Sequence, residues 1–190
     1  MTAFPLHTVD TAPEDSKAVL RATTQAYGFL PNLHATMAES PVALRGLDQL
    51  FALIGGGSLT PQEQQLTMLT VSVLNACEYC VAGHSFVGRS VQLDEAVVQA
   101  LRWGERITGK PRLQALQSFV EAAVNERGRV PGAVLAAFLE AGYTHRQSLE
   151  VVAIIAAKTL SNYANNLAGT PPDAFMADPA VRWVAPARSA

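Results

Sequence analysis

Residues 60–85 read TPQEQQLTMLTVSVLNACEYCVAGHS, and this stretch determines the fold class that we expect for the chain. Thr60, Pro61 and Glu63 occupy the positions of a capping box, in which a hydroxyl and a carboxylate satisfy free backbone N–H groups at the start of a helix. An apolar run from Leu66 to Leu74 follows, without the alternation typical of a strand. We therefore predict a helix that begins at Pro61.

The same helical pattern continues in both directions along the chain. Apolar residues recur every three or four positions, prolines stand at first helical positions, and glycines follow last ones. A second capping box, Thr144 to Gln147, opens the last helix, and its interior from Val151 to Ala157 is apolar on every side, as in a central buried helix. The sequence predicts an all-α fold, a single-domain bundle of eight or nine helices. The expected helices cover 13–28, a short segment after Pro31, 41–55, 61–74, a helix from position 76, 94–103, 111–126, 131–141 and 144–167.

The chain is expected to form one domain over 1–190, with 1–12 as a leader segment and 171–190 as an extended C-terminal arm. The aromatic side chains of that arm, Phe175 and Trp183, must be buried on this chain or on a neighbour. The segments 59–85 and 143–169 share a capped start followed by an apolar helix. We therefore consider an internal duplication of one helical unit as an alternative reading.

Composition excludes several classes of protein. The 190 residues are 49% hydrophobic and 16% charged, which is far from a disordered composition, and the net charge of −2 without a basic block excludes a nucleic-acid binder. The sequence contains neither a membrane span nor a recognisable secretory signal, so we expect a cytoplasmic protein without membrane partners. The two cysteines stand three positions apart and do not form a disulfide scaffold.

Those two cysteines and a histidine are the candidate site. Asn75 is a favoured N-cap and Glu78 can complete a capping box, so a helix is expected to start at position 76. On such a helix Cys77, Cys80 and His84 fall within a stripe of about 60°. The spacing permits a reversible disulfide, and free N–H groups at the helix start favour a Cys77 thiolate by roughly 1 kcal/mol.

Two other interpretations of the cysteine pair stay open. The cysteines could be inert core residues, or they could hold a metal ion, although a structural zinc site normally needs a fourth ligand that the sequence does not supply. The remaining histidines, His7, His34 and His145, stand alone and are expected at the surface or at helix caps.

The segment 60–85 resembles the signature of the carboxymuconolactone decarboxylase superfamily, in its alkylhydroperoxidase-D-like branch. The segments YGFLPN at 27–32 and LSNYAN at 160–165 also resemble peroxidase-related members, so the resemblance spans about 25–176. It implies an all-helical fold that assembles as a homo-oligomer, a trimer or hexamer. It also implies a hydroperoxide or disulfide substrate and an unidentified thiol reductant, and we expect no cofactor and no metal.

The resemblance assigns roles to four residues. Cys80 would become a sulfenic acid, Cys77 would resolve it to a disulfide, and His84 would belong to the proton relay. The relay glutamate of the family falls on Gln65, and an amide cannot take up and release a proton as a carboxyl group does. We therefore expect weaker peroxidase activity than in relatives with the carboxylate.

Two further departures lie beside these positions. Tyr79 stands where some members carry a histidine between the cysteines, and Asn166 stands where many relatives have a histidine near the end of the last helix. Both replacements reduce the number of groups available for base catalysis.

The predicted function is a CxxC thiol oxidoreductase, a peroxiredoxin-type enzyme that reduces hydroperoxides in an antioxidant role. One alternative is a lyase similar to the decarboxylases of the superfamily, and another is a non-catalytic helical assembly whose cysteines sense oxidation. The intact cysteine pair favours thiol chemistry, because a decarboxylase does not require it. Phe51, Phe86 and Trp103 are candidates to line an apolar cavity, or they are ordinary core residues.

Overall fold

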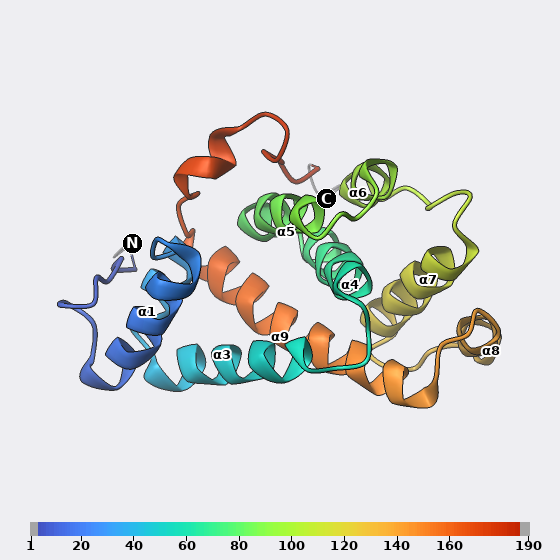
Figure 1. Ribbon diagram of the computed structural model, residues 1–190, viewed down its shortest axis with the longest axis horizontal. Coiled ribbons are helices and arrows are strands. Elements are labelled where there is room, and N and C mark those ends of the chain that lie inside the picture. Colours follow the sequence, from blue (N-terminus) through green and yellow to red (C-terminus); the bar gives the residue numbers. More distant parts are fainter. Residues whose placement is uncertain (1–3, 187–190) are drawn as a thin grey trace.

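The computed structural model describes residues 4–186, and within this range the protein is built from helices without strands (Figure 1). The predicted all-α fold with eight or nine helices is confirmed. None of the described helices is both long and apolar enough to cross a membrane. The helices are α1 Glu14–Tyr27, α2 Asn32–Met37, α3 Pro41–Gly55, α4 Pro61–Leu74, α5 Glu78–Ser90, α6 Glu95–Arg102, α7 Pro111–Asn125, α8 Gly132–Glu140 and α9 His145–Ala168, followed by the 3-10 turn η1 Ala174–Ala177.

Helix α4 is the centre of the molecule, with α5, α6, α7 and α9 packed around it (Figure 1). Every side chain from Leu66 to Ser72 is buried. The hydroxyls of Thr67, Thr70 and Ser72 donate to backbone carbonyls one turn earlier, which satisfies these polar groups inside an otherwise apolar core. Both predicted capping boxes, at Thr60 and at Thr144, are formed.

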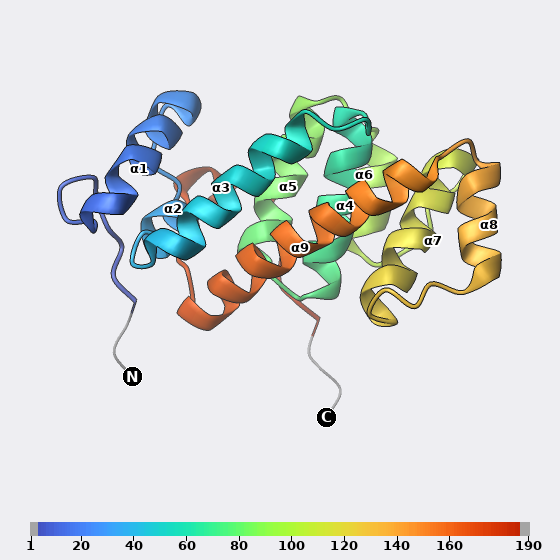
Figure 2. The same ribbon diagram turned by 90° about the horizontal axis from the view of Figure 1, so that it is seen from below.

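Helix α9 is not the central buried helix that its apolar interior predicts. It lies beside α3 on one face of the molecule and buries only the side that faces its neighbours α2, α3, α4, α5 and α7 (Figure 2). Val152 is 48% exposed and Leu149 is 71% exposed on its outer side. The prediction was wrong because a helix with apolar residues on every side can lie in the core or can leave some of these residues exposed at the surface. The sequence does not distinguish the two cases.

The segments 59–85 and 143–169 share a capping box at the start of a helix, but the secondary structure that follows it differs. The first contains two helices, α4 and α5, separated by a break, whereas the second is the single 24-residue helix α9. Tyr79 is half-buried and Tyr163 is 60% exposed, so these two tyrosines are not equivalent either. The structure therefore does not support a duplicated unit.

The break between α4 and α5 places the cysteines. Ala76 adopts a left-handed backbone with φ of 50°, and the N–H groups of Ala76 and Cys77 close back onto the carbonyls of Val73 and Ser72. This is a Schellman ending with alanine in the position that glycine usually takes. Asn75 is thus the last cap of α4 and does not open a new helix, which corrects the predicted start at position 76: α5 begins at Glu78 with Cys77 as its N-cap.

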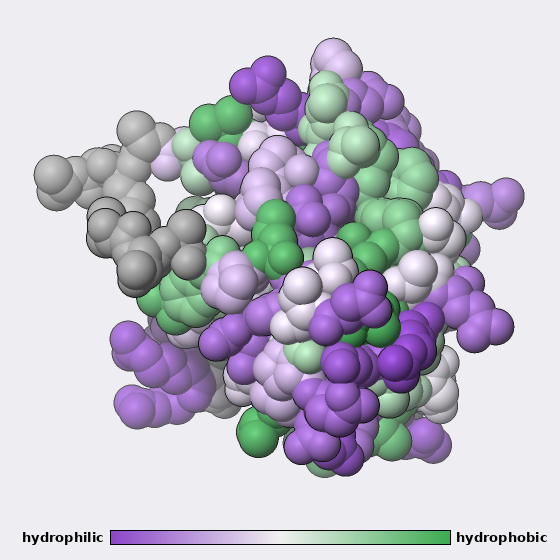
Figure 3. Space-filling model, turned by 90° about the vertical axis from the view of Figure 1, so that its left-hand side faces the viewer, coloured by the Kyte–Doolittle hydropathy of each residue, from purple (hydrophilic) through white to green (hydrophobic). Residues whose placement is uncertain are grey.

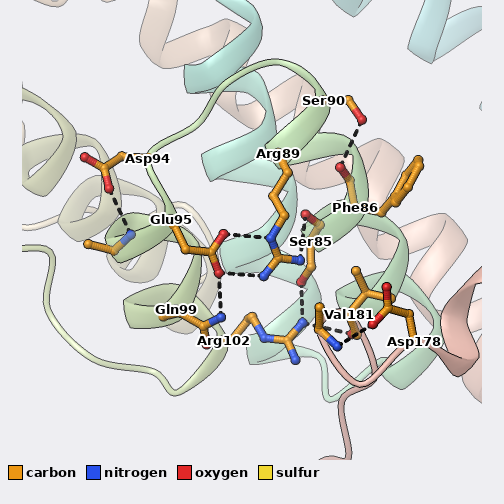
Figure 4. Close-up of polar contacts among 12 residues, drawn as sticks. Ser85, Phe86, Arg89, Ser90, Asp94, Glu95, Gln99, Arg102, Asp178 and Val181 are labelled. Atoms are coloured by element: carbon orange, nitrogen blue, oxygen red, sulfur yellow. Dashed lines mark hydrogen bonds and ion pairs between the residues drawn. The ribbon is translucent and has the colours of Figure 1, made fainter.

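The C-terminal arm crosses α5 and α6 and is held there by Arg102. The Arg102 guanidinium donates to Ser85 and to the carbonyl of Val181, each at 2.8 Å, and to the carbonyl of Arg182 at 2.7 Å (Figure 4). The Trp183 indole donates in return to the carbonyl of Arg102. Trp183 is therefore buried on this chain, one of the two outcomes that the sequence left open.

Apolar surface is distributed unevenly over the molecule. On the end that includes α1, apolar side chains lie in separate small groups among polar ones (Figure 3). Along α3 and α9, by contrast, large apolar side chains are exposed on two neighbouring helices: Val42, Leu53, Leu149, Val152, Tyr163 and Leu167.

Candidate functional site

Cys80 lies in the first turn of α5 and faces α9. Its Sγ accepts a hydrogen bond from Asn165 Nδ2 at 3.2 Å and another from the Cys77 thiol. Both cysteines are free thiols. The sulfur of Cys80 is thus surrounded by donors, an environment that favours a thiolate over a thiol.

A buried lysine supplies a positive charge that stabilises the thiolate form of Cys80. Lys158, on α9, is only 1% exposed, and its ammonium donates to the Ser161 hydroxyl at 3.1 Å. Burial by itself would raise the pKa of the Cys80 thiol, but the hydrogen bond from Cys77, the Lys158 ammonium and the amides of Asn165 and Asn162 outweigh burial and lower that pKa. Cys80 is therefore the thiol that ionises first.

Cys77 has the opposite character. Its hydrogen bond to Cys80 and its burial raise the pKa of the Cys77 thiol. The free N–H groups of the helix start favoured a Cys77 thiolate, and this expectation was wrong, because the pKa of Cys77 is raised and that of Cys80 is lowered. Cys77 is 0% exposed and Cys80 3% exposed, because Cys77 sits in the break between α4 and α5 while Cys80 borders a cavity.

His84, on α5, contacts Gln65, on α4. His84 Nδ1 lies 2.9 Å from Gln65 Oε1. An amide oxygen can only accept, so the Nδ1 proton belongs to His84, and its Nε2 carries the free lone pair. Burial and the nearby Lys158 ammonium lower the pKa of His84, so the ring is neutral at pH 7 and can act as a base.

Tyr79, between the two cysteines in sequence, connects the site to the C-terminal arm by hydrogen bonds. Its hydroxyl donates to Asp173 Oδ2 at 2.5 Å and accepts from the backbone N–H of Leu33 at 3.1 Å. Asp173 Oδ1 accepts from the backbone N–H of Asn32 at 2.9 Å. Burial and the bond to Asp173 raise the pKa of Tyr79, so it stays a neutral phenol. Tyr79 thus positions neighbouring segments and is not available as a base.

Cys80, His84 and Lys158 open into one cavity of about 380 Å³, within the size range of small-molecule sites. Its wall is mostly apolar and aromatic. Phe51 and Phe86 line it, as the sequence suggested, whereas Trp103 is 65% exposed at the end of α6 and lies elsewhere. Further lining residues include Tyr27, Phe29, Pro31, Leu33, His34, Tyr79, Asp173, Phe175 and Met176.

Several residues of this site were missed from the sequence. Lys158, Asn162 and Asn165 follow each other at i, i+4 and i+7 on α9, so they share one face, and polar residues at that spacing in an apolar helix were the available signal. His34 is buried in the cavity wall and not at the surface as expected. Asn166, whose position was compared with a family histidine, points away and donates to the carbonyl of Asn75.

No cluster of three or more His, Cys, Asp or Glu side chains that could hold a metal ion occurs within residues 4–186. The candidate site contains two thiols, the amides of Asn162, Asn165 and Gln65, the Lys158 ammonium and two histidines.

The comparisons with known proteins agree with the family resemblance seen in the sequence. Residues 41–122 match the model of the carboxymuconolactone decarboxylase family. A peroxidase-related protein from Ralstonia eutropha JMP134 with an alkylhydroperoxidase AhpD core is similar over 92% of this chain and 94% of its own, with 25% identity and a TM-score of 0.78. The chain therefore carries the signature of the carboxymuconolactone decarboxylase family over 41–122 and is similar throughout to an alkylhydroperoxidase-D-like protein.

Two more distant solved structures share the fold of this chain. A peroxidase-related protein from Silicibacter sp. TM1040 has 16% identity and a TM-score of 0.74, with 90% of each chain covered. The debrominase Bmp8, as a cysteine-to-alanine variant in complex with 2,3,4-tribromopyrrole, has 21% identity and a TM-score of 0.72, with 92% of this chain and 93% of that chain covered. No curated protein matches the chain. The same fold thus occurs in proteins described by different chemistries.

Proposed function

We propose that this protein is a thiol peroxidase in which Cys80 attacks a hydroperoxide and Cys77 then closes a disulfide with it. The observation that carries the proposal is the Cys80 sulfur, which borders a cavity and lies under the influence of a buried ammonium that favours the thiolate. A thiolate is the form of cysteine that reacts with peroxides. The match to the carboxymuconolactone decarboxylase family model and the likeness to an alkylhydroperoxidase-D-like protein support the same chemistry.

In the first step the Cys80 thiolate attacks the terminal oxygen of the hydroperoxide. An S–O bond forms and the O–O bond breaks, so that Cys80 is oxidised to a sulfenic acid and the hydroperoxide is reduced to an alcohol. The departing alkoxide takes a proton from the Lys158 ammonium, which lines the same cavity and is reprotonated from solvent.

In the second step the Cys77 sulfur attacks the sulfenic sulfur of Cys80. The S–S bond forms, and the sulfenic hydroxyl leaves with the Cys77 proton as water. The neutral His84, with its Nε2 lone pair fixed by Gln65, is the base that assists this proton transfer. An external dithiol then supplies two electrons and two protons to restore both thiols.

Thiol counting after one equivalent of an organic hydroperoxide tests the proposal. The reduced wild-type protein should lose two thiols per chain and recover both with a dithiol reductant. Cys77→Ser should lose its one thiol and retain a sulfenic acid that a dione reagent traps, whereas Cys80→Ser should keep its thiol. Oxidation of Cys80→Ser as fast as wild type would contradict the assigned roles.

Two control measurements separate the alternatives. Repeated turnover with excess hydroperoxide and dithiol is expected of a peroxidase, whereas a single oxidation that changes assembly without turnover would identify a redox sensor. Turnover of a carboxylated lactone by the double variant Cys77→Ser/Cys80→Ser would instead identify a lyase, because that variant has no redox-active thiol.

The proposal includes a homo-oligomer, formed through the exposed apolar side chains of α3 and α9. Leu53, Leu149 and Leu167 are each more than two-thirds exposed on these two neighbouring helices, and a second copy of the chain would bury them (Figure 2). Light scattering measures the molar mass, and thus the oligomeric state, of the wild type and of the double variant Leu149→Lys/Leu167→Lys. A smaller particle is expected for the variant, and an unchanged mass would argue against this face.

A further inference from the structure

The C-terminal arm supplies part of the cavity wall through η1, which lies against α5 (Figure 1). The proposed thiol chemistry uses no residue of this arm. Phe175 and Met176 of η1 nevertheless line the cavity that the Cys80 sulfur borders, and Met176 is buried there. A segment outside the helices that carry the cysteines and the lysine therefore shapes the space that a substrate enters.

The Phe175 ring contacts two other aromatic rings that line the same cavity. Its centroid lies 5.0 Å from that of Phe86, on α5, and 6.1 Å from that of Phe29, in the loop between α1 and α2. Phe29 and Phe86 are exposed at the rim, whereas Phe175 is half-buried. The three rings form an apolar surface along the path from solvent to the Cys80 sulfur, so the organic part of a substrate can pack against them.

Hydrogen bonds hold the arm in place on both sides of Phe175. Before η1, the Asp173 carboxylate accepts from the Tyr79 hydroxyl and from the backbone N–H of Asn32. After η1, two backbone carbonyls of the arm accept from the Arg102 guanidinium (Figure 4). A ring that is fixed from both sides is pre-organised, so packing a ligand against it requires little additional ordering of the chain.

We propose that Phe175 is the specificity-determining residue of this site and that it selects uncharged hydroperoxides with a bulky apolar group over hydrogen peroxide. The inference rests on the proposed peroxidase function. A phenyl ring stabilises a bound molecule in proportion to the apolar area buried against it, and hydrogen peroxide has no such area. A charged substrate is disfavoured, because the Cys80 thiolate already compensates the Lys158 ammonium and the Asp173 carboxylate lines the same cavity.

A series of hydroperoxides of decreasing size tests the inference. Phe175→Ala removes about 50 Å² of apolar contact with a phenyl group, which corresponds to about an eightfold loss of affinity. We expect kcat/KM to fall about eightfold for cumene hydroperoxide and about threefold for tert-butyl hydroperoxide, with kcat unchanged. The rate of Cys80 oxidation by hydrogen peroxide should change by less than about twofold, because that substrate makes no apolar contact.

The alcohol product of cumene hydroperoxide, 2-phenyl-2-propanol, reports the same contact without turnover. In calorimetric titration of the reduced proteins, Phe175→Ala should bind it about eightfold more weakly than wild type, and Phe175→Leu, which keeps apolar area, within about threefold. Phe4→Ala, at an exposed phenylalanine that does not line the cavity, is the matched control and should change neither binding nor rates. Thermal unfolding of each variant shows whether folded proteins are being compared.

The pattern of results distinguishes this inference from the proposed function. The inference is overturned if the wild type does not bind the alcohol, or if Phe175→Ala slows all three peroxides by one factor, as a purely structural residue would. A wild type that binds the alcohol through Phe175 but reduces no peroxide would contradict the peroxidase function and support the contact. A wild type that reduces all three equally well, with no effect of Phe175→Ala, would contradict the selectivity alone.

Discussion

Two buried polar clusters beside α4, one around Glu63 and one around Lys158, have opposite electrostatic arrangements. In the first cluster Glu63 accepts from Arg112 Nε at 3.0 Å and from the Thr60 N–H at 2.9 Å, and the Arg112 guanidinium lies 3.8 Å from the Tyr143 ring centre. In the second cluster the buried Lys158 ammonium has a hydroxyl as its hydrogen-bond partner, and no carboxylate within residues 4–186 lies within ion-pair distance of it.

The difference separates a structural cluster from a reactive one. Burial would raise the pKa of Glu63, but the Thr60 backbone and the contacts with Tyr143 and Arg112 outweigh it and lower that pKa, so this charge is fully compensated. The charge of Lys158 is compensated only when a cysteine sulfur ionises. A buried cation that is compensated by a nucleophilic thiolate indicates a reactive site. A buried ion that is paired with an oppositely charged side chain indicates a structural role.

Lys158→Met should produce the largest effect. Removal of the ammonium raises the pKa of the Cys80 thiol, so the thiolate fraction at pH 7 falls, and we expect alkylation of Cys80 by iodoacetamide to slow about 100-fold. The unfolding free energy should change little, because methionine replaces a buried charge with an apolar chain of similar length. An alkylation profile against pH that matches wild type would show that Lys158 does not control the thiol.

Arg112→Met is the counterpart in the Glu63 cluster. It leaves the buried Glu63 carboxylate without its cation, and we expect a loss of about 2 kcal/mol in unfolding free energy, below the range for fully buried pairs because Arg112 is 44% exposed. Chemical denaturation measures the loss. The Cys80 alkylation rate should stay within twofold of wild type, and a large fall in that rate would remove the distinction between the two clusters.

Gln65→Glu sharpens the comparison by adding a carboxylate to the reactive cluster, next to His84. A carboxylate against His84 Nδ1–H makes Nε2 more basic, and we expect the peroxidase rate to rise about tenfold at equal thiol content. Gln64→Glu, one position earlier on α4 and bonded to the carbonyls of Ile54 and Leu59, is the control. An unchanged or lower rate in Gln65→Glu would refute the relay role of this position.

The pH dependence of stability should be the smallest effect. The pKa of His34 falls to about 4 in the folded protein through burial, below its unfolded value of about 6.5. Its stabilising contribution is therefore complete above pH 6.5 and is lost as pH falls from 6.5 toward 4. Denaturation at pH 7.5 and pH 5.5 should show that His34→Phe loses roughly 1 kcal/mol less than wild type. Equal losses in both proteins would show that His34 charges freely.

Helix positions could be predicted because their signals are local. Thr60 with Glu63 and Thr144 with Gln147 mark helix starts within four residues of sequence. The break before α5 was misplaced because Asn75 fits both a last and a first cap, and only the left-handed backbone of Ala76, unusual for alanine, decides between them. A single sequence does not indicate which alanine adopts that conformation.

The positions of the candidate residues could be predicted in part, for a related reason. Cys77 contacts Cys80, His84 contacts Gln65, and Cys80 and His84 line the same cavity. Which sulfur ionises first depends on Lys158, a residue of another helix far along the chain. The helix start accounts only for the electrostatic effect of the cysteines' own helix on their pKa values. The charge of a buried ammonium, brought close by tertiary packing, has a larger effect on those pKa values.

The isolation of Lys158 also has a consequence for the redox balance of the protein. With both cysteines reduced, the interior holds a cation and an anion together, whereas a disulfide carries no charge and leaves the cation alone in a medium that solvates it poorly. The dithiol form is thereby favoured over the disulfide, as in strongly oxidising thiol proteins whose reduced state is stabilised. The bond between the two sulfurs would accordingly be easy to reduce, so even a mild electron donor would suffice to return the protein to its resting state.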